Sequence, residues 1–83
     1  MIGKLASIKG ELGIVKEDSK RVKRVKLSEE VLDELGFIIG GQYYKDSFVL
    51  GSDFIHKKTR INYIDELQEH YLKETGEQLW TEQ

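Results

Sequence analysis

No cysteine occurs among the 83 residues of this chain, and this absence constrains its fold more than any other feature. Small domains with little core usually depend on disulfides or on thiolate metal sites, and neither can form here. Stability must therefore come from packing alone. Because a chain of this length supports only one hydrophobic core, we expect a single domain over residues 1–83.

The hydrophobic segments of the chain are short. None approaches the ~18 residues that a membrane-spanning helix requires. The first ten residues also lack the apolar stretch of a signal peptide. The sequence therefore predicts a cytoplasmic protein that makes no membrane contact.

Charge is distributed unevenly along the chain. Residues 1–26 carry eight lysines or arginines and three acidic residues, a net charge of +5, whereas residues 27–83 carry five basic and twelve acidic residues, a net charge of −7. Such asymmetry is typical of interaction surfaces, because a basic stripe attracts phosphates or acidic partners and an acidic face suits a basic groove. It is equally consistent with a pattern that only maintains solubility.

The first predicted helix has clear signals at both ends. Ser28 is a suitable N-cap, and the acidic pair at 29–30 complements the helix dipole. Gly36 is the expected left-handed residue after the helix, and Phe37 can close back onto Leu32 in a Schellman arrangement. These signals predict a short helix over residues 29–35.

Before this helix we expect an N-terminal hairpin from segments 2–8 and 11–15, and a strand segment over residues 21–27. In that segment Val22 is out of phase with the later alternation, so a bulge or a strand end is needed near Lys23.

The middle of the chain reads as antiparallel strands. Residues 38–39, 42–44, 47–50 and 54–56 are segments rich in aromatic or β-branched residues and bounded by turn signals, and residues 57–60 are expected to be a basic connector. If Tyr43 faces inward, then Tyr44 must face outward, and the same holds for Phe48 and Val49. Asn62 is the expected N-cap of a second helix, with Asp65 at N3, and Gly76 is expected to end it.

Together these elements predict an α+β fold. We expect two helices packed against one small antiparallel sheet, in the order ββ-α-βββ-α. At the C-terminus, Leu79 and Trp80 are expected to fold back onto the domain as a plug.

The sequence contains no recognisable catalytic or metal-binding motif. His56 and His70 are expected on different elements, and Glu66 with His70 offers only two ligands where a stable zinc site needs three or four. No serine lies in a nucleophile elbow, and Gly40-Gly41 lacks the pattern of a phosphate-binding loop. We therefore expect a protein that is not an enzyme and that uses neither a metal nor a cofactor.

A basic segment is the best local candidate for a binding site. It places five cations within seven residues, namely Lys20, Arg21, Lys23, Arg24 and Lys26. Such a segment can follow a phosphate backbone, and the basic residues at 57, 58 and 60 would extend it if the fold brings the two together. The alternative is a solvated edge strand, because lysines at a sheet edge prevent aggregation.

Aromatic residues are a second feature with two interpretations. Seven of them, including Tyr43, Phe54 and Tyr63, could supply a stacking platform for nucleic-acid bases. A small domain, however, needs most of its aromatic residues in the core.

Two stretches of the sequence resemble small uncharacterised proteins encoded by bacteriophages and prophages. The first is Leu27-Ser28-Glu29-Glu30-Val31-Leu32-Asp33-Glu34-Leu35-Gly36-Phe37, followed by Tyr43-Tyr44 and Phe48-Val49-Leu50. The second is Tyr63-Ile64-Asp65-Glu66-Leu67-Gln68, then Tyr71, then Thr75-Gly76-Glu77-Gln78-Leu79. The resemblance covers about residues 27–79 and implies a mobile-element accessory protein acting inside a bacterial cell.

Binding is the leading function class in this context. The first hypothesis is that acidic residues of the second helix meet a basic surface of an unidentified host protein, through Asp65, Glu66, Glu69 and Glu74. The alternative is nucleic-acid binding through the basic segment 20–26. A third possibility is a homodimer formed by pairing edge strands, and the sequence leaves open whether the chain is a monomer or a homodimer.

Overall fold

The structure is a computed structural model that describes residues 1–81. Its elements are β1 (Leu5–Ile8), β2 (Glu11–Ile14), β3 (Val22–Lys23), α1 (Glu29–Glu34), β4 (Ile38–Gly40), β5 (Gln42–Lys45), β6 (Phe48–Leu50), the 3-10 helix η1 (Ser52–Phe54), β7 (Ile55–His56), β8 (Thr59–Arg60) and α2 (Ile64–Thr75). The predicted α+β class, with two α-helices and antiparallel strands, is confirmed.

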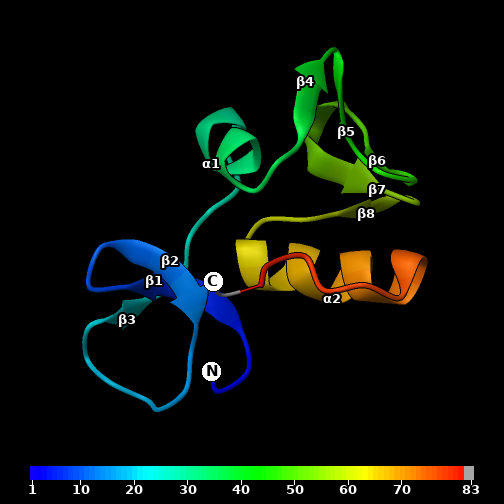
Figure 1. The fold of residues 1–83 in the computed structure, drawn as a ribbon. Coiled ribbons are helices and arrows are strands. Elements are labelled where there is room, and N and C mark those ends of the chain that lie inside the picture. The colour runs from blue at the N-terminus through cyan, green and yellow to red at the C-terminus, as the bar shows by residue number, and fades with distance from the viewer. Residues whose placement is uncertain (82–83) are drawn as a thin grey trace.

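The strands form three small sheets, so the prediction of one sheet is wrong. Their orders are β2-β1-β3, β4-β5-β6 and β7-β8. Figure 1 shows the first sheet at one end of the molecule and the other two at the opposite end, with α2 running alongside β8. Pairing between distant strands cannot be read from strand patterns alone, and this is why the sequence did not reveal the division.

The N-terminal sheet brings the basic segment against the first hairpin. β1 pairs with β2 on one side and with β3 on the other, where Ser7 lies opposite Lys23 and Ile8 lies opposite Val22. β3 ends at Lys23, which agrees with the break in alternation that the sequence shows there. β3 is therefore a short edge strand with exposed cations on both sides of it.

Helix α1 is capped as the sequence predicts. Ser28 Oγ accepts a hydrogen bond from the Val31 amide at 3.3 Å. At the other end Gly36 has φ +92°, and the Phe37 amide donates to the Leu32 carbonyl at 2.9 Å. This bond closes the Schellman motif and directs Phe37 into the core, where it is 3% exposed.

The sheet β4-β5-β6, which we call the middle sheet, shows the predicted alternation of buried and exposed side chains. Tyr43 is half-buried while Tyr44 is exposed, and Phe48 is fully buried while Val49 is 42% exposed. Residues 57–60, expected to be a connector, instead form the turn and second strand of the β7-β8 hairpin. Lys57 and Lys58 both have positive φ, at 47° and 72°, as a type I′ turn requires, and lysine gives no sequence signal for that conformation.

Helix α2 begins one residue later than the sequence predicts. Its N-cap is Tyr63 rather than Asn62, and the N3 residue is Glu66 rather than Asp65. The Glu66 carboxylate accepts the backbone amides of both Asn62 and Tyr63 at 3.0 Å. Asn62 lies outside the helix, and its carbonyl accepts the Leu27 amide at 2.9 Å. Gly76, with φ +75°, ends the helix as predicted.

A buried glutamine joins α2 to the N-terminal sheet. Gln68 is 8% exposed, its Oε1 accepts the Leu5 amide at 2.7 Å, and its Nε2 donates to the Gly3 carbonyl at 3.1 Å. These bonds satisfy backbone groups that the hairpin leaves unpaired. The core itself consists of Leu5, Leu27, Leu32, Leu35, Phe37, Phe48, Leu50, Ile61, Ile64, Leu67, Tyr71 and Leu79.

The C-terminal segment returns along α2 towards the N-terminal sheet (Figure 1). Leu79 is 3% exposed and belongs to the core, and Trp80 packs against it, so the predicted plug is confirmed. Within residues 1–81 the structure has no helix with the length and apolar character needed to span a membrane.

Candidate functional site

A hollow lined by four cations lies on the N-terminal sheet. We call it the basic hollow, and its volume is about 510 Å³. Its lining residues are Ser7, Lys9, Gly10, Lys20, Arg21 and Lys23. Among residues 1–81 no acidic side chain lines this hollow, and Glu17 lines a neighbouring pocket together with Lys9 and Arg21. The four cations therefore make the potential of the hollow positive.

Strand pairing assembles the basic hollow from two parts of the chain. The β1-β2 turn supplies Lys9, whose amide donates to the Arg21 carbonyl at 3.3 Å. Before β3, Ser19 Oγ accepts the Arg21 amide at 3.2 Å, and the Val22 amide donates to the Ser19 carbonyl at 3.2 Å. These bonds fix the backbone on both sides of the hollow, while the cationic side chains remain exposed.

The side chains of the four cations of the basic hollow have no hydrogen-bond or ion-pair partner among residues 1–81. Arg24, the next cation along the segment, differs from them. Its guanidinium donates to both Asp65 carboxylate oxygens, at 3.1 and 3.0 Å, and lies 3.9 Å from the centre of the Tyr63 ring. The Asp65 carboxylate raises the pKa of Arg24 above its ordinary value. Arg24 therefore links the segment to α2, and an external ligand would have to compete with Asp65 for it.

The acidic residues of α2 are used within the chain. Asp65 binds Arg24, and Glu66 caps the helix. Glu69 accepts Lys4 Nζ at 2.5 Å, which lowers the pKa of Glu69. Glu74 lies 2.8 Å from Lys57 Nζ, which lowers its pKa as well. All four residues of the predicted acidic face therefore have intramolecular partners.

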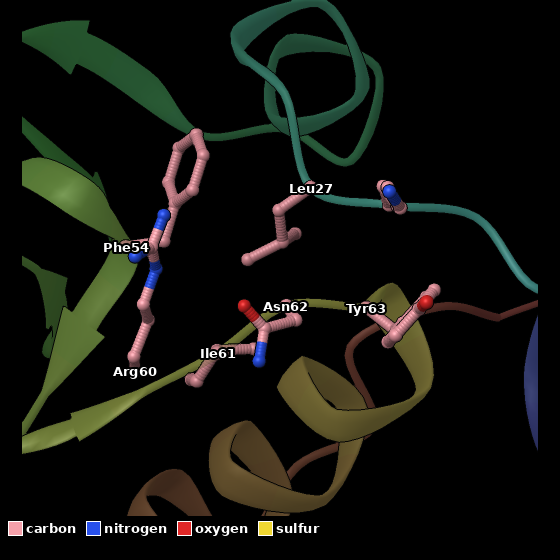
Figure 2. Close-up of a pocket in the computed structure, with 7 residues that line it drawn as sticks. Leu27, Phe54, Arg60, Ile61, Asn62 and Tyr63 are labelled. Atoms are coloured by element: carbon pink, nitrogen blue, oxygen red, sulfur yellow. The ribbon is translucent and has the colours of Figure 1, made fainter.

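A second cleft lies where the basic segment meets the start of α2. We call it the aromatic cleft, and its volume is about 410 Å³. Its lining residues are Lys26, Leu27, Phe54, Arg60, Ile61, Asn62 and Tyr63. Figure 2 shows Phe54 and Arg60 on one side of it and Tyr63 on the other, with Leu27 and Ile61 between them.

Backbone pairing builds the aromatic cleft. Lys26 and Tyr63 form an isolated antiparallel bridge, and the Ile64 amide donates to the Val25 carbonyl at 2.9 Å. The basic segment therefore lines the basic hollow at one end and the aromatic cleft at the other. Arg60, which the sequence suggested could extend the basic patch, lines the same cleft as Lys26, whereas Lys57 pairs with Glu74 elsewhere.

Several residues of these sites were missed by sequence reasoning. Lys9 reaches the basic hollow only through the strand register, which the sequence does not specify. Phe54 and Tyr63 were considered as stacking residues, but nothing in the sequence places them on opposite sides of one cleft. Asn62 was interpreted as a helix cap, whereas its side chain lines the cleft.

The two histidines form a pair away from both sites. Their Nδ1 atoms lie 3.1 Å apart, so one ring donates and the other accepts when both are neutral. The His56 ring stacks on Phe48 with centroids 4.5 Å apart, and its Nε2 lies 3.8 Å from the Glu74 carboxylate. Burial lowers the pKa of His56, and the nearby His70 and Lys57 lower it further against the opposing effect of Glu74.

We expect the free energy of unfolding to decrease as the pH is lowered from about 7 to about 5. Because the pKa of His56 is lowered in the folded state, the unfolded chain binds more protons below the ordinary histidine pKa of about 6.5. Urea unfolding measured at several pH values checks this. A His56→Asn variant should show a shallower dependence, and an equally steep one would contradict this explanation.

Comparisons with protein-family models, with curated proteins and with solved structures found no match to this chain. Within residues 1–81, no group of three or more histidine or acidic side chains is placed to hold a metal ion. The basic hollow and the aromatic cleft are the features of the chain from which a function can be inferred.

Proposed function

We propose that this chain is a small non-enzymatic nucleic-acid-binding protein, and that the phosphate backbone binds in the basic hollow. One observation carries the proposal: Lys9, Lys20, Arg21 and Lys23 line one hollow, and among residues 1–81 no acidic side chain lines it or forms an ion pair with them. Exposed, unpaired cations on a fixed backbone are the groups that replace counterions around a polyanion. The net charge of −2 does not oppose this, because local charge governs binding at one face.

The resemblance to phage and prophage proteins suits a protein that meets nucleic acid inside a cell. A chain of that kind would act inside a bacterial cell, as an accessory protein of a mobile element. Nucleic acid of the element or of the host is abundant there.

Binding of a host protein through Asp65, Glu66, Glu69 and Glu74 stays a prediction with less support. A partner that used these carboxylates would have to compete with Arg24, with Lys4, with Lys57 and with the helix cap that Glu66 provides. The cations of the basic hollow face no such competition among residues 1–81.

The salt dependence of binding tests the proposed function. Fluorescence anisotropy with labelled single-stranded DNA and RNA should show affinity falling about fifty-fold between about 50 and 200 mM salt, as expected for about four phosphate contacts on a single strand. Inorganic polyphosphate should compete. The absence of binding to either nucleic acid at low salt would contradict the proposal.

A further inference from the structure

The aromatic cleft combines the chemical groups that recognise an unpaired base. Phe54 and Tyr63 line it from opposite sides, and the apolar side chains of Leu27 and Ile61 lie between them. Stacking on aromatic rings is the main interaction by which proteins hold the bases of single strands.

Both rings are held in place before any ligand binds. The Tyr43 ring packs on Phe54 with centroids 5.4 Å apart, and the Arg24 guanidinium covers one side of Tyr63. Asp65 in turn fixes Arg24 through two hydrogen bonds. Since these side chains are already ordered, a base entering the cleft would lose little affinity to ordering of the protein.

The polar groups of the cleft suit a nucleotide rather than a purely apolar ligand. Asn62 has its backbone amide bound to Glu66 and its carbonyl bound to Leu27, so its side-chain amide remains without a partner among residues 1–81. This amide can donate to and accept from the edge of a base. Lys26 and Arg60 are exposed cations at the same cleft, and neither has an ion-pair partner within that described part of the chain.

The basic hollow and the aromatic cleft lie close together along the basic segment. Lys23 of the basic hollow and Lys26 of the aromatic cleft are three residues apart, which spans at most ~10 Å. This is about the axial rise of three nucleotides in one strand of a duplex. A strand whose phosphates lie on the basic hollow can therefore reach the cleft with a neighbouring nucleotide.

From these observations we infer that the aromatic cleft binds one unpaired base of a single-stranded nucleic acid whose phosphates occupy the basic hollow. This inference rests on the proposed function and adds to it a preference for single strands. A paired base is stacked within a duplex and cannot enter between Phe54 and Tyr63.

Strands with and without bases test this inference. The probes are labelled strands of about 12 nucleotides, within the range that small single-strand-binding domains cover. One carries normal bases and the other has abasic sites throughout, with the same phosphates. The wild-type protein should bind the normal strand about ten-fold more tightly than the abasic strand, and more tightly than a duplex of equal length.

Substitutions in the cleft should remove this preference. Phe54→Leu should reduce affinity for the normal strand about ten-fold, and Asn62→Ala should reduce it by a smaller factor. Tyr44→Ala is the matched control, because it removes an exposed aromatic side chain from the middle sheet. Thermal melting of each variant shows whether it is folded, and Asn62→Ala provides an independent test if Phe54→Leu is destabilised.

The outcomes separate the inference from the proposed function. Equal binding of normal and abasic strands by the wild type overturns the inference and leaves phosphate binding intact. A base preference that persists in both cleft variants also overturns it. If neither strand binds the wild type, the proposed function itself fails.

Discussion

Replacing Lys20, Arg21 and Lys23 together by alanine should weaken nucleic-acid binding by more than about 100-fold at about 50 mM salt. Each phosphate contact releases a condensed counterion, and a lost contact removes this favourable contribution to binding. On a single strand, three contacts account for about two units of the slope of log affinity against log salt concentration. The three residues line the basic hollow and have no ion pair within residues 1–81. Anisotropy titrations at several salt concentrations measure both the affinity and the slope.

The matched control for this variant carries the same change in charge at another place. Lys57, Lys58 and Lys73 are exposed and lie outside both the basic hollow and the aromatic cleft. Replacing them by alanine should leave the salt slope unchanged and reduce affinity only slightly, because distant charges are screened within about 10 Å at 0.1 M salt. If both triple variants lost affinity equally, binding would depend on net charge and not on the basic hollow.

Phe48→Ala should lower the free energy of unfolding by about 3–5 kcal/mol. Phe48 is fully buried and lies at the centre of an aromatic group. Its ring centroid is 4.5 Å from that of His56, 5.4 Å from that of Tyr71 and 6.2 Å from that of Phe37. The residue therefore joins the middle sheet, the β7-β8 hairpin and α2, and its loss would remove much of the 5–15 kcal/mol that usually stabilises a domain.

The neighbouring residue supplies the control for Phe48→Ala. Val49 is 42% exposed on the opposite face of β6, so Val49→Ala should cost less than about 1 kcal/mol. Denaturant unfolding measures both variants under the same conditions. A cost for Phe48→Ala no greater than that for Val49→Ala would show that the described core is wrong.

The features predicted correctly from sequence are those that depend on local interactions. The caps of α1 involve residues within nine positions of one another, and Ser28 and Gly36 adopt the roles that their side chains favour. Phe48 and Val49 point to opposite faces of the sheet because successive side chains alternate between the two faces in any strand. Gly76 ends α2 for the same local reason.

The features that the sequence did not predict depend on distant pairing. The start of α2 is shifted because Asn62 is bound to Leu27, which lies 35 positions earlier. The basic segment could be identified from the sequence. The ion pair between Arg24 and Asp65 could not, because these residues are 41 positions apart. The aromatic cleft likewise requires Phe54 and Tyr63 to approach the basic segment from distant parts of the chain.

The measurement that most directly tests the proposed binding is an NMR titration of the isotopically labelled protein with a short single strand. We expect backbone amide signals to shift around residues 7–10 and 19–23, which surround the basic hollow, and around residues 54 and 60–63 of the aromatic cleft. The exposed amides of the middle sheet serve as an internal reference and should not shift. Shifts confined to residues 65–74 of α2, or no shifts at low salt, would contradict the proposed nucleic-acid binding.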